Sequence, residues 1–185
     1  MALRDTFRRL IPWRWQRTSL KEPLSIVLLL RKPHLFTEDE MRLAAQRAYH
    51  TSFAGTDGSI NCVAKAGIDP LLIAGPHLLK LFHYPHPYID DPSHNVKWLP
   101  QAIQRKAWCE HTACVGVDYF NEDVDLELAY SVLTKLAAEM LDGNCTAIYM
   151  PRDNRLIPNY ESAYLELQSF ASSRNLGIVP PSTPD

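Results

Sequence analysis

The stretch from Val96 to Met150 constrains the fold most, because its hydrophobic pattern switches between helix and strand periods and capping residues stand at the switches. Residues 99–108 carry apolar side chains three or four positions apart, with Pro100 in the first turn, which predicts a helix. Residues 111–118 are small or β-branched on both faces. They therefore predict a strand that is covered on both sides.

A second helix and strand follow in the same stretch. Residues 124–140 repeat apolar side chains every four positions, and we expect the helix to end at Gly143 in a left-handed conformation. Residues 145–150 predict a short strand that Pro151 ends. Strand, crossover helix and strand together predict a parallel pair formed by 111–118 and 145–150.

The remaining elements have shorter signals. Strands are predicted at 24–30, 60–64, 71–74 and 77–84. Thr37 and Glu40 have the spacing of a capping box, which predicts a helix start, and Asn159 is a candidate cap for a last helix. This order predicts an α+β fold, in which helices mainly cover one face of a mixed sheet, in a sandwich related to ferredoxin-like arrangements.

Charge divides the chain unevenly. Residues 1–22 hold six Lys or Arg residues against Asp5 and Glu22, a net charge of +4, so the rest carries −6 of the total of −2. We therefore expect no nucleic-acid partner. The predicted organisation is a basic aromatic extension at 1–23, a single α+β domain at 24–176 and a proline-rich tail at 177–185.

The extension has two interpretations. Its Arg residues and its Trp13 and Trp15 suit weak contact of residues 1–21 with an anionic membrane surface. Alternatively, its aromatic side chains fold back onto the domain, which we prefer because Pro12 interrupts the helical pattern.

Four cysteines occur at positions 62, 109, 114 and 145, without the paired spacing of a zinc site. They mostly lie in apolar runs, so buried free thiols and a reducing, cytoplasmic setting are expected. A membrane-spanning helix needs about 20 consecutive apolar residues, and no apolar run in the sequence approaches this length.

His111 is the main candidate for catalysis, because it stands where a helix becomes a buried strand. In the functional interpretation it is a general base beside Glu110 or Asp118, and Cys109 is a candidate nucleophile. In the structural interpretation, which we prefer, its ring fixes the corner by bonding a backbone carbonyl.

His83, His86 and His94 are the candidates for metal ligands, since imidazole suits zinc, copper or iron. Residues three apart in an extended chain point to opposite faces, so we expect no metal and no cofactor. The aspartates in turns, Asp57, Asp69, Asp90 and Asp91, are explained by turn chemistry.

Several short motifs together resemble one family. They are Leu-Leu-Leu-Arg-Lys-Pro at 28–33, Phe-Thr-Glu-Asp-Glu at 36–40, Trp-Cys-Glu-His-Thr-Ala at 108–113 and Leu-Thr-Lys-Leu-Ala-Ala at 133–138. This pattern resembles an uncharacterised bacterial family, domain of unknown function 4261. The resemblance implies a cytoplasmic bacterial protein and no known reaction or cofactor.

The sequence therefore favours a non-enzymatic module that binds a protein or a small ligand, with Trp98, Trp108 and the 84–88 loop as aromatic contact surface. One alternative is a small, hydrolase-like enzyme that uses His111 with loop carboxylates. The other is a peripheral membrane protein that binds through residues 1–21.

Overall fold

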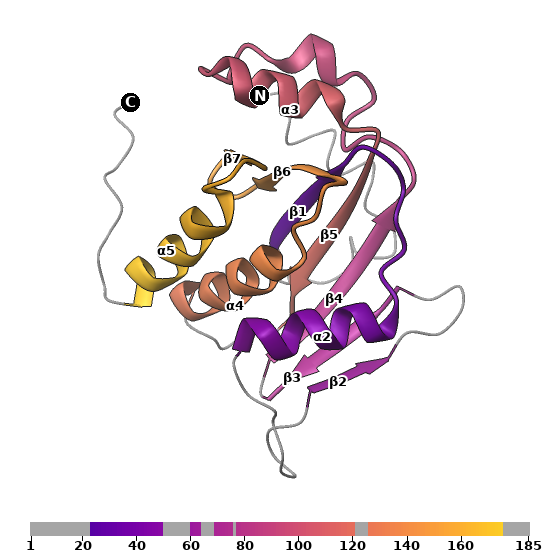
Figure 1. Ribbon diagram of the computed structural model, residues 1–185, viewed down its shortest axis with the longest axis vertical. Helices are drawn as coiled ribbons and strands as arrows, with labels where there is room; N and C mark the ends of the chain where they lie inside the picture. Colours follow the sequence, from indigo (N-terminus) through magenta and orange to yellow (C-terminus); the bar gives the residue numbers. More distant parts are fainter. Residues whose placement is uncertain (1–22, 50–59, 64–68, 76, 121–125, 176–185) are drawn as a thin grey trace.

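The computed structural model describes residues 23–49, 60–63, 69–75, 77–120 and 126–175 (Figure 1). Its elements in chain order are β1 (Leu24–Leu30), α2 (Glu38–Tyr49), β2 (Ile60–Val63), β3 (Leu71–Ala74), β4 (His77–Tyr84), the 3₁₀ helix η2 (Pro92–Asn95), α3 (Ala102–Glu110), β5 (Ala113–Tyr119), α4 (Leu126–Glu139), β6 (Cys145–Met150), β7 (Arg155–Pro158) and α5 (Ala163–Asn175). The predictions for residues 1–22 and for the tail at 177–185 lie outside the described residues. The α+β class is confirmed.

The strands form one sheet in the order β2-β3-β4-β5-β1-β6-β7, and every neighbouring pair is antiparallel. β1 lies in the interior of the sheet, between β5 and β6. Ile26 and Leu28 contact one core and Val27 and Leu29 the other, so both faces of β1 are buried. A strand that is buried on both faces carries apolar residues at successive positions and does not alternate apolar with polar residues.

The expected parallel pair is wrong as a direct pair, and the sheet is antiparallel where a mixed sheet was expected. β5 and β6 are joined through α4, but β1 lies between them, and Val27 faces both Gly116 and Tyr149. The connection from β5 through α4 to β6 therefore passes over β1 and reaches the second strand position. The hydrophobic periodicity of one segment does not show which strand lies between two others. The order β4-β5-β1-β6, with α2 and α4 as the connecting helices, is compatible with a ferredoxin-like relation.

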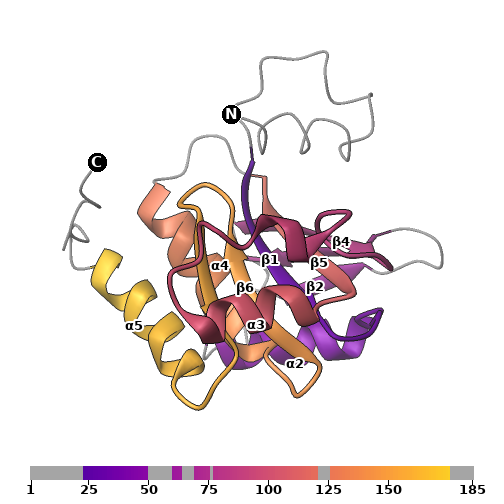
Figure 2. The ribbon, with the colours of Figure 1, turned by 90° about the horizontal axis from the view of Figure 1, so that it is seen from above.

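The helices lie mainly on one face, as predicted. Residues of α2, α4 and α5 pack with one face of the sheet, whereas Trp108 and Ala107 of α3 pack on the opposite face. Viewed from above, α3 crosses in front of the strands and α2 lies behind them (Figure 2). The sheet thus separates two cores, one of them small and rich in aromatic rings.

The capping box at the start of α2 is confirmed. The backbone N–H of Thr37 donates to Glu40 Oε2 at 2.7 Å, and the N–H of Glu40 donates to Thr37 Oγ1 at 3.2 Å. Two N–H groups that the helix leaves unpaired are thereby satisfied. The loop that precedes α2 is fixed at this point.

Two local predictions are wrong. The helix α4 does not end with a left-handed glycine, since Gly75 is the glycine with positive φ among the described residues; instead Asp142 Oδ1 accepts the N–H groups of Asn144 and Cys145. Asn159 does not cap α5. Its side chain donates to the carbonyls of Asp142 and Cys145, because the unpredicted strand β7 ends just before it.

Candidate functional site: a groove between two helices

A groove of about 240 Å³ lies between α2 and the end of α4. Its apolar lining comes from both helices and the loops beside them, and consists of Phe36, Leu43, Ala44, Met140 and Leu141. Its polar lining consists of His34, Glu40, Arg47, Glu139 and Asp142. Leu43 is 46% exposed and Leu35, in the adjoining loop, is 74% exposed, so apolar surface continues outside the groove.

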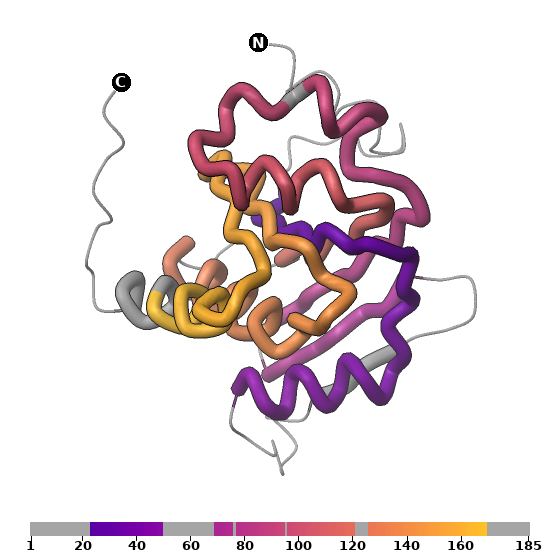
Figure 3. Tube along the Cα trace, turned by 45° about the horizontal axis from the view of Figure 1, so that its top comes forward, coloured from indigo at the N-terminus to yellow at the C-terminus, as the bar shows by residue number. Residues whose placement is uncertain are grey.

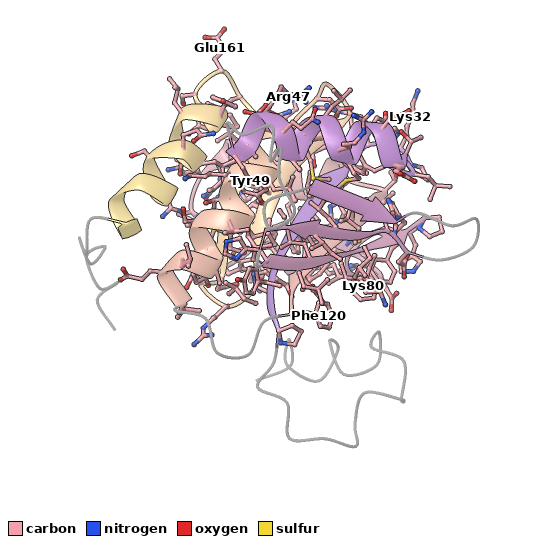
Figure 4. All side chains as sticks on the ribbon, turned by 90° about the horizontal axis from the view of Figure 1, so that it is seen from below. Lys32, Arg47, Tyr49, Lys80, Phe120 and Glu161 are labelled. Carbon is pink, nitrogen blue, oxygen red and sulfur yellow. The ribbon has the colours of Figure 1, made fainter. Side chains whose placement is uncertain are left out.

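Charged contacts close one side of the groove. Arg47 Nε lies 2.9 Å from Glu139 Oε2, and the hydroxyl of Tyr164 donates to Glu139 Oε1 at 2.7 Å. The side chain of Glu139 is only 11% exposed, so its two donors compensate a largely desolvated carboxylate. Arg47 projects from the outer side of α2, across the sheet from Lys80 (Figure 4). These contacts join α2, α4 and α5 at one point.

The other side of the groove is the connection from β1 to α2. His34 Nε2 lies 3.4 Å from Glu40 Oε1. The backbone N–H of Phe36 donates to His83 Nε2 at 3.2 Å, so the end of β4 supports this wall. The hydrogen bond from the Thr37 N–H lowers the pKa of Glu40, which keeps that carboxylate ionised at neutral pH.

Three carboxylates, of Glu40, Glu139 and Asp142, and one guanidinium, of Arg47, therefore line the groove together with its apolar residues. A groove of this composition suits an apolar side chain with a positive charge close by. Its volume is below the roughly 300–1,000 Å³ of pockets that hold whole small molecules. A volume of this size has room for about one amino-acid side chain.

His111 lies far from this groove, in the aromatic core under α3. It is 1% exposed. Its Nδ1 donates to the carbonyl of Trp108, and its Nε2 accepts the N–H of Tyr88 at 3.1 Å. Burial lowers the pKa of His111, which keeps the ring neutral. Both ring nitrogens bond to backbone, and the carbonyl bond is the one that the structural interpretation expects.

The other proposed catalytic residues are not gathered around His111. Glu110 lies 3.5 Å from Arg31 and 3.7 Å from Lys106 in two surface ion pairs. Cys109 is exposed on α3. Asp118 is seven residues along β5, roughly 23 Å away at about 3.3 Å per residue, so it cannot orient the imidazole.

Asp118 nevertheless has an unusual environment. Burial raises its pKa to about 6, which the hydrogen bond with Ser25 and the charge of Lys80 only partly oppose. Ser25 and Lys80 are its cross-strand neighbours on β1 and β4. Asp118 is a partly buried titratable group of the sheet, on the face opposite to the groove.

The three histidines considered as candidate metal ligands are dispersed. His83 faces the β1–α2 connection, His86 contacts the carbonyl of Pro87, and His94 pairs with Asp91 beside η2. Within the described part of the chain, no three His, Cys, Asp or Glu side chains are grouped to hold a metal ion. Asp57 lies outside the described residues.

The aromatic contact surface predicted from the sequence is wrong for two of its members. Trp108 is fully buried and Tyr88 is 7% exposed. They pack edge-to-face at 6.1 Å, and Trp98 and Tyr149 complete the cluster. These rings form the smaller core, because α3 closes over them.

The groove could not be recognised in the sequence. Glu40 has the spacing of a helix cap and no other signal, and Arg47 and Glu139 are 92 residues apart in the chain. The one available signal was Leu43, a large apolar residue beside the small-residue face of its helix.

Comparisons with known proteins add no assignment. No protein-family model matches the chain, and neither the search of curated proteins nor the search of solved structures found a match. Among the helices that the structure describes, none is long and apolar enough to span a membrane.

Proposed function

We propose that this protein is a non-enzymatic binding module, and that its α2–α4 groove receives an apolar side chain of a partner protein flanked by Lys or Arg. The observation that supports this best is the composition of the groove, an apolar floor with three carboxylates and one guanidinium around it. Leu35, which is exposed beside the groove, extends the apolar contact area that Leu43 provides in its lining.

The test uses two blocked pentapeptides with a central leucine, one with two lysines on each side of it and one with two glutamates on each side. Both are titrated into the full-length, ¹⁵N-labelled protein. The lysine peptide should shift the amide signals of Leu43, Ala44 and Leu141 in a saturable way, and less so at high salt, because salt screens exposed charges. The glutamate peptide should leave them unchanged.

Two variants, each with one exposed apolar residue changed to serine, sharpen this test. Leu43→Ser should weaken binding of the lysine peptide at least threefold. Ile103→Ser is the matched control, because Ile103 is 47% exposed on α3 against 46% for Leu43, and it should bind as the parent does. Equal affinity in both variants, or no groove signal shifted by the lysine peptide, would refute the proposal.

Membership of domain of unknown function 4261, a cytoplasmic location and the lack of a nucleic-acid partner remain proposals. Four short sequence motifs, at 28–33, 36–40, 108–113 and 133–138, support membership of the family. The buried free thiols of Cys114 and Cys145 support the cytoplasmic location. The net charge of −6 outside residues 1–22 supports the lack of a nucleic-acid partner. Fractionation of cells of the source organism with an antibody to the protein tests the location.

A further inference from the structure

One wall of the groove is hydrogen-bonded to an imidazole of the sheet. His83, at the end of β4, accepts the N–H of Phe36 on Nε2 at 3.2 Å, and its side chain is 10% exposed. The connection from β1 to α2 lies beside this end of β4 (Figure 3). Phe36 itself lines the groove.

The hydrogen bond fixes the tautomer of His83. Since Nε2 accepts, the proton of the neutral ring resides on Nδ1, which lies 3.8 Å from Asp69 Oδ1. A second proton would have to bind at Nε2, the atom that accepts the Phe36 N–H. Two donors would then face each other, and the Phe36 N–H would lose its acceptor.

We propose that His83 is a pH-responsive latch, in which the neutral ring holds Phe36 in the wall of the α2–α4 groove and protonation releases the connection. The inference rests on the proposed function only where it says that release alters binding. The latch itself follows from the hydrogen bond between β4 and the connection.

Two titratable groups, Asp69 and His34, act on this imidazole in the described residues, and a third, Glu40, acts on His34. Asp69 lies before β3 and its charge raises the pKa of His83, whereas burial lowers it more strongly, and the charge of His34 also lowers it. Glu40 of α2 acts through His34, which it pairs with. Because the pKa of His83 is lowered from the ordinary value of about 6.5, the hydrogen bond is still intact at pH 6.5 and is lost as the pH falls through the lowered pKa.

The experiment measures hydrogen exchange of the Phe36 amide in the full-length protein between pH 7.5 and pH 5, as a protection factor corrected for the intrinsic rate. We expect the protection of Phe36 to fall at least tenfold on acidification. The amide of Leu28 in the central strand should keep its protection over the same range, which separates release of the connection from global unfolding.

Three variants make the assignment specific. His83→Gln keeps an acceptor that does not titrate, so Phe36 should be protected at both pH values. Asp69→Asn should move the midpoint to lower pH, because it removes the charge that raises the pKa of His83. His86→Gln, at an exposed neighbouring histidine, should behave as the parent.

Constant protection of Phe36 in the parent, or an unchanged pH response in His83→Gln, would overturn the latch. If His83→Gln fails to fold, the Asp69→Asn variant decides instead. A pH midpoint of Phe36 protection that is not lower in Asp69→Asn than in the parent would also overturn the latch. None of these readouts needs a partner, so failure of the lysine peptide to bind would refute the proposed function and leave the latch standing.

Discussion

The ring of His111 connects Tyr88 to Trp108: it accepts the backbone N–H of the first at 3.1 Å and donates to the carbonyl of the second. Tyr88 belongs to the proline-rich connection, and Trp108 to the last turns of α3. This irregular connection has no ladder partner for the Tyr88 N–H, so the imidazole provides one. The residue that the sequence marks as a candidate base is a buried support of the aromatic core.

His111→Ala should lower the free energy of unfolding by about 2–5 kcal/mol, because it leaves two buried backbone groups unpaired and opens a cavity. Urea denaturation at pH 7.5 measures this loss. The control is His94→Ala, whose side chain is 80% exposed and which should cost under about 0.5 kcal/mol. Similar losses in both variants would contradict the support role.

Asp118→Asn should stabilise the protein at pH 8. The folded pKa of Asp118 is raised from the usual 3.8 to about 6, so its contribution to stability is fully present below about pH 4 and is lost as the pH rises through 6. After a discount for solvent screening, we expect a gain of about 1–2 kcal/mol at pH 8 from a shift of this size.

The same variant should flatten the dependence of the unfolding free energy on pH between 4 and 6, measured by urea denaturation. Asp90→Asn, at an exposed position, is the control that should keep the parental slope. An Asp118→Asn protein that is less stable than the parent at pH 8 would mean that the hydrogen bond with Ser25 and the charge of Lys80 outweigh the cost of burial.

Thr37→Ala should cost about 0.5–2 kcal/mol, since the side chain that caps the Glu40 N–H is removed. Thermal unfolding followed by circular dichroism measures it. Thr37→Ser retains the hydroxyl and should stay within about 0.5 kcal/mol of the parent. A serine variant as unstable as the alanine variant would point to the lost methyl group as the cause.

Cys109 should react with a maleimide much faster than Cys114 and Cys145 in the folded protein. Cys109 is exposed, whereas burial raises the pKa of each of the other two thiols to about 12 and leaves almost no thiolate. Mass spectrometry of labelled peptides in a Cys62→Ser background ranks the rates. As a control, adding Cys109→Ser to this background should abolish rapid labelling. Rapid labelling that persists at Cys114 would contradict the burial of that thiol.

The local patterns predicted the strands well. The boundaries of β1, β3, β4 and β6 agree with those expected from the sequence, because an apolar run or alternation bounded by Gly or Pro reports burial directly. The strand β7 was not predicted, because its four residues include the charged Arg155 and Pro158 and give no apolar run. The turn before it, in which Asn154 has a φ of 48°, lets β7 pair with β6.

Strand neighbours and the groove could not be predicted in this way. Periodicity states which face of an element is buried, but not which strand is inserted between β5 and β6. The contact of Arg47 with Glu139 and that of His83 with Phe36 likewise arise only when α2 is placed on the sheet. Both depend on tertiary packing, which a single sequence does not display.

The position of β1 has a consequence for how the chain assembles. Leu30 pairs with Ala113 on one side and Cys145 on the other, so the first strand of the sheet to be synthesised is completed by residues more than 80 positions later. Such long-range pairing makes folding slow, since the entropy of closing large loops is lost before the contacts form. During synthesis both hydrogen-bonding edges of β1 lack their partners until β5 emerges, and one edge lacks its partner until β6 emerges. An unpaired edge of this kind can pair with another nascent chain.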